Sequence, residues 1–241
     1  MISLGLYGIR GGTGSSSLLA ALGYALHTLE QRVLLVDMCP ENLLCLHFNL
    51  AVTQTGGWAR ALLDGQDWTD QVWSLAPNLS VLPHGRLIGT DRARLAQALD
   101  QRPGLWARRM NVLAEHFDWI LFDLPRRSPW QDNAVSCQLQ IQIVEADAAC
   151  HVLLQQQEEE RADSLLLNRF DPASQIQRDL ALIWRQHYDA RLLPITVHSD
   201  EAMREALASK QPVGRYAPDS LVAQDVLSLA VWCQAHQGEL R

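Results

Sequence analysis

Short apolar runs alternate with longer segments of helical character along the whole chain. Runs rich in β-branched and large apolar residues predict strands, and apolar positions at helical spacing predict helices. The expected strands cover residues 2–7, 32–36, 79–82, 119–122, 139–144, 164–167 and 192–195. The expected helices cover residues 16–29, 57–63, 91–116, 149–157, 176–188, 200–208 and 220–237. Nearly continuous apolar strands between helices predict βαβ units and a mostly parallel sheet covered on both faces.

The predicted fold class is α/β, with one doubly wound, mostly parallel sheet flanked by helices. The 241 residues suit a single domain that spans residues 1–241, and no internal repeat or Pro-, Gly- or Ser-rich linker divides them. In such folds the ligand binds at the carboxyl ends of the strands. Functional side chains are therefore expected directly after the strands.

Composition limits which partners the chain can bind and in which compartment it is expected. The net charge of −7 argues against a broad nucleic-acid surface, which needs Lys and Arg against phosphates. The five scattered cysteines form no Cys-x-x-Cys pair, so their spacing predicts neither a disulfide framework nor a zinc site and suits the cytoplasm. No apolar run approaches the roughly 20 residues of a membrane helix, so we expect no direct membrane insertion.

A glycine-rich loop follows the first predicted strand and leads into the first predicted helix. Residues 8–17 read GIRGGTGSSS. Glycines let backbone N–H groups approach an anion closely, and the start of a helix adds partial positive charge, so this loop predicts a phosphate cradle. The candidate nucleotide-binding residues are Arg10, Gly11, Gly12, Thr13, Gly14, Ser15, Ser16 and Ser17. The usual P-loop has Lys before Ser or Thr, whereas this chain has Ser15 before Ser16.

Three polar residues end predicted strands. Asp37 and Asp123 each follow four apolar residues, and Asn168 follows the strand 164–167. Mg²⁺ bound to a triphosphate takes hard oxygen ligands, so Ser16, Asp37 and Asp123 are the candidate metal site. The alternative is that each aspartate caps the next turn. The amide of Asn168 can offer a donor and an acceptor to adenine, although such an asparagine is usually a turn residue.

These motifs resemble the MinD/ParA group of P-loop ATPases over essentially the whole chain. The resemblance rests on residues 10–16 (RGGTGSS), the strand ends at Asp37 and Asp123, and residues 167–169 (LNR). Longer strings are similar to the BcsQ family of bacterial cellulose biosynthesis proteins. These are residues 37–44 (DMCPENLL), 57–68 (GWARALLDGQDW), 200–203 (DEAM) and 210–214 (KQPVG).

The resemblance implies binding of ATP with Mg²⁺ and a homodimer with two nucleotides at its interface. Arg10 would then stand where the group has a lysine that reaches the partner's phosphates. Asp37 would be the catalytic residue, and Asn168 and Pro194 would complete the nucleotide-binding set. The BcsQ family further implies a small accessory partner, BcsR, and recruitment from the cytoplasm to the inner-membrane cellulose synthase and secretion complex.

The sequence departs from active ATPases at two positions. Ser15 replaces the phosphate-binding lysine, and Cys39 stands where many members of the group have a second aspartate. We therefore expect slow or absent hydrolysis, and whether the chain is an enzyme stays open. The alternative function is a partition or positioning ATPase that cycles on membrane or DNA. These two residues and the net negative charge of the chain argue against it. A scaffold that binds no nucleotide is a third possibility.

Tryptophans gather in the segment after the second predicted strand, at Trp58, Trp68 and Trp73. Large aromatic side chains are common both in cores and at partner-binding surfaces. The sequence does not decide between these two roles.

Overall fold

The computed structural model describes residues 1–51, 53–125, 135–157 and 163–238. Its strands are β1 (Ile2–Gly8), β2 (Val33–Asp37), β3 (Trp73–Ala76), β4 (Leu79–Leu82), β5 (Trp119–Asp123), β6 (Leu139–Val144), β7 (Ser164–Phe170) and β8 (Leu192–His198). Its α-helices are α1 (Ser15–Thr28), α2 (Trp58–Asp64), α3 (Asp91–Asp100), α4 (Leu105–Leu113), α6 (Ala148–Gln155), α7 (Gln175–His187), α8 (Ala202–Ala208), α9 (Val213–Tyr216) and α10 (Leu221–His236). Two 3₁₀ helices cover Leu44–Phe48 (η1) and Thr69–Gln71 (η2).

The eight strands form one sheet in the order β3-β4-β2-β5-β1-β6-β7-β8. All neighbours pair in parallel except β3 and β4, which are antiparallel. The predicted α/β class and mostly parallel sheet are therefore confirmed. Only β3 was missed, because its four residues are partly exposed and carry no continuous apolar run.

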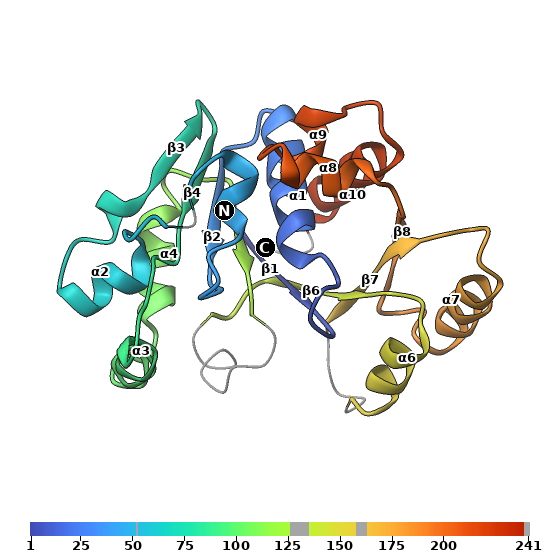
Figure 1. Cartoon of the computed structure of the whole chain (residues 1–241), viewed down its shortest axis with the longest axis horizontal. Helices are drawn as coiled ribbons and strands as arrows, with labels where there is room; N and C mark the ends of the chain where they lie inside the picture. The colour runs from blue at the N-terminus through green and yellow to red at the C-terminus, as the bar shows by residue number, and fades with distance from the viewer. Residues whose placement is uncertain (52, 126–134, 158–162, 239–241) are drawn as a thin grey trace.

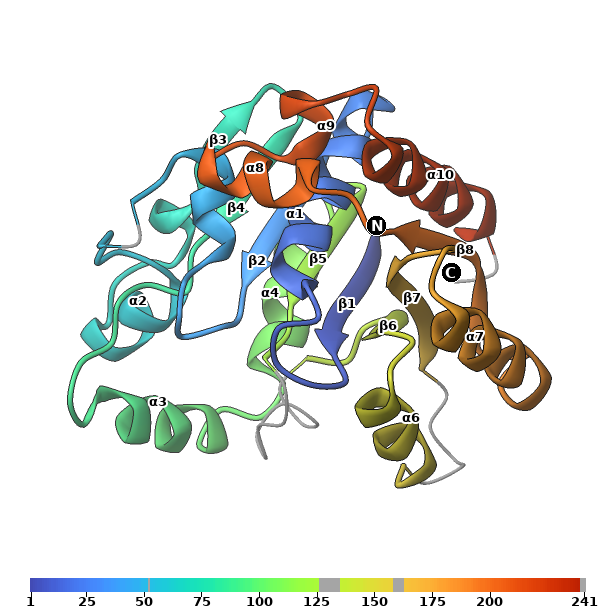
Figure 2. The same cartoon turned by 45° about the vertical axis from the view of Figure 1, so that its right-hand side comes forward.

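Helices cover both faces of the sheet (Figures 1 and 2). One face packs against α1, α8, α9 and α10, and the other packs against α2, α3 and α4 at one end and α6 and α7 at the other. The central strands alternate between the faces, as β geometry requires. On β5, for example, Trp119 and Leu121 join the core beneath α1, while Ile120 and Phe122 join the opposite core.

The helix predicted over residues 91–116 is two helices, α3 and α4. Gly104 adopts a left-handed backbone with φ of 72° between them. Pro103 precedes it, and proline lacks the N–H that a continuous helix needs, so the single-helix prediction was wrong at this point.

Among the residues that the structure describes, no helix combines the length and the apolar character needed to cross a membrane.

Candidate functional site

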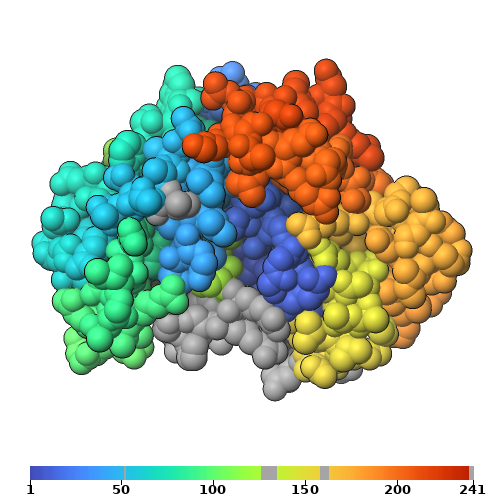
Figure 3. Space-filling model, viewed as in Figure 1, coloured from blue at the N-terminus to red at the C-terminus, as the bar shows by residue number. Residues whose placement is uncertain are grey.

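The glycine-rich loop connects β1, at the centre of the sheet, to the start of α1. Gly12 and Gly14 have φ of 82° and 88°, a left-handed conformation that favours glycine. A Cβ atom added at Gly11 or Gly12 would meet no atom within 4 Å. The space-filling view shows this N-terminal segment at the surface, between the exit of β2 and α6 (Figure 3). The loop therefore lies at the surface with a backbone that glycine favours, as a phosphate-binding loop would need.

Two neighbouring residues at the end of β7 anchor the loop from the side. Asn168 Nδ2 donates to the carbonyl of Thr13 at 2.7 Å, and Arg169 Nη1 donates to the carbonyl of Gly12 at 2.7 Å. One N–H of the Asn168 amide is thus used by the loop, which leaves the second N–H and the oxygen. Contact with adenine stays a prediction for Asn168.

A hydroxyl and a carboxylate meet beneath the loop. Ser16 Oγ donates to one oxygen of Asp123 at 2.5 Å. The other oxygen, Asp123 Oδ1, is buried and has no hydrogen-bond partner among the residues that the structure describes. Buried polar atoms are nearly always satisfied, so an unpaired carboxylate oxygen beside a phosphate cradle fits a divalent cation. Ser16 and Asp123 would hold Mg²⁺ there, and the ion would supply charge neutralisation for bound phosphates.

Asp37 has a more local set of partners. Its carboxylate accepts hydrogen bonds from the backbone N–H groups of Cys39 at 2.8 Å and Leu44 at 3.3 Å. This is the turn-capping alternative raised for the strand-end aspartates. The backbone carbonyl of Asp37 also accepts a bond from Trp58 Nε1 at 2.8 Å. These contacts fix the carboxylate next to Asp123, where it can still order the water around a cation.

The carboxyl groups of Asp37 and Asp123 lie close enough to affect protonation because β2 and β5 are neighbouring strands. Their Cα atoms are paired in the sheet register, and both side chains are fully buried. Burial, followed by the negative charge of Asp123, raises the pKa of Asp37 well above its usual value. Burial also raises the pKa of Asp123 to about 7, against the opposing effect of the Ser16 hydrogen bond. A bound cation would reverse both shifts, because it favours the charged carboxylates.

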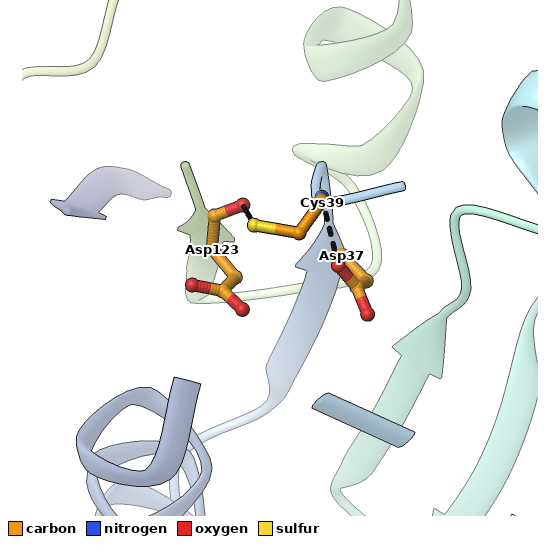
Figure 4. A group of neighbouring side chains, drawn as sticks. All are labelled: Asp37, Cys39 and Asp123. Atoms are coloured by element: carbon orange, nitrogen blue, oxygen red, sulfur yellow. Dashed lines mark hydrogen bonds between the residues drawn. The ribbon is translucent and has the colours of Figure 1, made fainter. Parts of the chain in front are cut away.

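Cys39 completes a cluster with the aspartates. Its sulfur, one oxygen of Asp37 and one oxygen of Asp123 all lie within 4.8 Å of one another. Figure 4 shows the three side chains converging from the ends of β2 and β5.

Arg10 is held by its own chain. It forms ion pairs with Glu145 and, at 2.6 Å, with Asp147. The hydrogen bond to Asp147 is the main reason that the pKa of Arg10 lies above its usual value. Glu145 also accepts from Arg169 at 2.7 Å, so one carboxylate bridges two arginines beside the loop. A contact from Arg10 to a partner's phosphate stays a prediction, and it requires that these internal ion pairs open.

A small pocket adjoins the loop at the ends of β7 and β8. Gly14, Ser17 and Asn168 line it, together with His198. His198 Nδ1 lies 2.9 Å from Asp225. Pro194, placed in the nucleotide-binding set by the resemblance, is an exposed residue within β8 and is not among the lining residues.

The sequence analysis missed four residues around the loop: Glu145, Asp147, Arg169 and His198. The strand-end signal that identified Asp37 and Asp123 also applies to Glu145, which directly follows β6. His198 is the last residue of a strand predicted to end three residues earlier.

The tryptophans divide between core and surface. Trp58 is fully buried, with its ring 5.2 Å from Trp106 in an edge-on arrangement. Trp68 is partly buried over Arg109, whereas Trp73 is 40% exposed. Trp58 is therefore a core residue attached to the site through Asp37, and Trp73 belongs to the surface.

Comparison with known protein sequences identifies the family of this chain. The family model described as "Cellulose biosynthesis protein BcsQ" matches residues 1–234. Cellulose biosynthesis protein BcsQ of Salmonella typhimurium is 42% identical over 247 residues, covering 98% of this chain and 95% of that protein. The protein of that name from Escherichia coli K12 is 40% identical, covering 100% and 97%. The chain belongs to the BcsQ family.

Solved structures place this BcsQ-family chain in the fold of the MinD/ParA ATPases. The septum site-determining protein MinD of Pyrococcus horikoshii, complexed with Mg-ADP, has a TM-score of 0.75 at 19% identity and covers 100% of this chain and 98% of its own. A ParA family ATPase from Chlorobium tepidum has a TM-score of 0.70 at 20% identity, covering 95% and 98%. The predicted fold and family are both confirmed.

Proposed function

We propose that this BcsQ-family chain binds ATP with Mg²⁺ at the loop of residues 8–17 and assists bacterial cellulose biosynthesis. Residues 1–241 act as a single nucleotide-binding domain. The nucleotide-bound form is a homodimer that associates with the inner-membrane cellulose synthase and secretion complex from the cytoplasm. BcsR is the small accessory partner. Family membership supports the process, and the geometry of the loop supports the ligand.

The observation that carries the proposal is the unpaired oxygen of Asp123. This oxygen belongs to the carboxylate that accepts a hydrogen bond from Ser16, and Ser16 is itself part of the glycine-rich loop. A carboxylate left half-satisfied in a buried position costs stability unless a ligand completes it. The Mg-ADP complex of the MinD relative shows that this fold accommodates such a ligand in another protein.

Hydrolysis is expected to be slow. The side chains around the loop position phosphates and a cation, but Ser15 offers no charge to the departing phosphoryl group. Stabilisation of transition-state charge supplies most of the catalysis in phosphoryl transfer. Arg10, the nearby cation identified from the sequence, is engaged with Glu145 and Asp147. Nucleotide binding, rather than turnover, is the proposed source of control.

Calorimetry on folded, nucleotide-free protein tests this function. We expect binding of ATP that strengthens with Mg²⁺, and the Mg²⁺ dependence should disappear in Asp123→Asn. Asp219→Asn, an exposed aspartate outside the site, is the matched control and should behave like the parent. Absence of heat with ATP and Mg²⁺ on folded parent protein would rule out the proposed ligand.

Association is tested separately from nucleotide binding. Light scattering with ATP and Mg²⁺ measures the dimer, and co-purification with BcsR and the cellulose synthase complex measures recruitment. Sedimentation with duplex DNA and with anionic vesicles tests the positioning-ATPase alternative. Binding to either, stimulated by ATP, would favour that alternative over an accessory role in cellulose biosynthesis.

A further inference from the structure

The thiol of Cys39 lies beside the carboxyl groups of Asp37 and Asp123. Its Sγ donates to the backbone carbonyl of Asp123 at 3.5 Å and lies within 4.8 Å of a carboxylate oxygen from each aspartate. Figure 4 shows the sulfur between the ends of β2 and β5, beside both carboxyl groups. The three side chains thus present one sulfur and two oxygens to a common space.

The cluster contains an unused ligand atom. Asp123 is fully buried, and within the described ranges its Oδ1 has no hydrogen-bond partner because Ser16 bonds only to the other oxygen. The Asp37 oxygens each accept one backbone N–H and retain a further lone pair. Each carboxylate therefore has a lone pair free for a cation, while the Cys39 thiol would exchange its hydrogen bond to the Asp123 carbonyl for a metal–sulfur bond.

We infer that Asp37, Cys39 and Asp123 bind a thiophilic divalent cation of the zinc class in the nucleotide-free protein. Mg²⁺ prefers six hard oxygen ligands, whereas Zn²⁺ binds sulfur and oxygen together and accepts three protein ligands. The fourth position is left for water or a phosphate oxygen. As the metal–sulfur bond forms, the thiol proton is released to solvent, and no redox change is involved.

The dimensions suit a tetrahedral ion. Zn–S and Zn–O bonds of about 2.3 and 2.1 Å place ligand atoms about 3.5 Å apart, so modest rotation of the carboxylates closes the observed spacing. The site escapes recognition by cysteine spacing because it uses a single cysteine, and Asp123 is distant from it in sequence. The strand pairing of Asp37 with Asp123 brings the ligands together.

Cobalt provides the direct test, since Co²⁺ substitutes for Zn²⁺ and reports sulfur ligation by a near-ultraviolet charge-transfer band. The full chain is freed of metal and nucleotide, kept reduced, and titrated with Co²⁺. We expect one equivalent to produce the band, and Zn²⁺ to displace it. Cys39→Ser should abolish the band and weaken Zn²⁺ binding at least about 100-fold, because loss of a ligand exceeds the effect of an outer-shell change.

Two further variants keep the result interpretable. Cys233→Ala removes another buried cysteine, in α10 and outside the cluster, and should leave the band and affinity unchanged. Cys39→Asp should lose the band and shift selectivity from Zn²⁺ towards Mn²⁺ and Mg²⁺. A band that persists in Cys39→Ser, or no band with the parent protein, would overturn the inference.

This inference does not depend on nucleotide binding. ATP and Mg²⁺ are measured on the same Cys39→Ser protein by calorimetry. Retained ATP binding without the cobalt band supports both proposals, whereas a parent protein that binds Zn²⁺ but not ATP would leave the metal site and remove the proposed function.

Discussion

Asp37 and Asp123 face each other as the last residues of neighbouring parallel strands, and neither of these fully buried carboxyl groups forms an ion pair within the described part of the chain. Burial and mutual repulsion raise the pKa of Asp37 well above its usual value, and burial raises that of Asp123 to about 7. The protein without ligands therefore carries an electrostatic cost at neutral and higher pH.

The first prediction is that Asp123→Asn stabilises the ligand-free protein at pH 8 and much less at pH 5. Unfolded Asp titrates near its ordinary value of 3.8, so the folded state holds the proton more tightly and loses stability as pH rises through about 7. This pKa shift corresponds to at most about 4 kcal/mol of unfolding free energy, or roughly 8–16 °C of melting temperature for a chain of this size. Thermal melts across this pH range measure it.

The same melts with ATP and Mg²⁺ should reverse the order of the two proteins. Only the parent can gain the cation at Asp123, and a ligand that binds the folded state stabilises it. A parent protein whose stability is flat between pH 5 and 8 would contradict this account.

Arg10→Ala tests the ion pairs beside the loop. We expect loss of about 1 kcal/mol of folding free energy or less, because Glu145 keeps its contact with Arg169. The ATP-bound protein should shift towards monomer, because a charge-assisted bond from Arg10 to the partner's phosphate would contribute about 1.5–3 kcal/mol to dimer formation, more than the internal ion pairs contribute to folding. Light scattering measures assembly, and Arg10→Lys should retain much of it. An Arg10→Ala protein that binds ATP and dimerises like the parent would confine Arg10 to its internal contacts.

The rate of ATP hydrolysis should rise when a lysine is introduced at position 15. The parent is expected to turn over well below about 1 s⁻¹. Ser15→Lys, at the first residue of α1, restores a charge against the phosphates and should raise the rate at least about tenfold, given the roughly 10²–10³ contribution of one such donor. Phosphate release measures turnover, and Ser15→Ala serves as the uncharged control. A fast parent enzyme would refute this explanation.

Trp58→Phe should disturb the site through its backbone. The substitution removes the indole N–H that the carbonyl of Asp37 accepts and leaves a buried acceptor with one bond fewer. We expect a loss of about 1–3 kcal/mol in unfolding free energy. Trp73→Phe, at a 40% exposed position, should be nearly neutral in the same denaturant titration. Equal, small effects from the two variants would contradict a stabilising bond between Trp58 and Asp37.

The sequence predicted the elements with strong local signals. Apolar strands, the glycine loop and the strand-end aspartates all follow from short segments, and Asp37 and Asp123 do lie together. The break between α3 and α4 could also have been predicted, since Pro103 and Gly104 stand adjacent. β3 could not, because an edge strand of four half-exposed residues depends on its neighbour for pairing.

The contacts between charged side chains could not be predicted from the sequence. Glu145 bridges Arg10 and Arg169, and these three residues come from the ends of two strands, β6 and β7, and from the loop after β1. Sequence distance says nothing about such bridges unless the strand order is known. The order β5-β1-β6-β7 places these strand ends in a row, and that order emerges only from the assembled sheet.

The position of β1 has a consequence for synthesis. Its pairing partners are β5 and β6, and Ile2 has no strand neighbour before Trp119 in the chain. The strand β1 must therefore wait for its partners until β5 has been synthesised, and long-range pairing of this kind slows folding. The glycine-rich loop at the end of β1 thus gains its place in the sheet only after β5 has been translated.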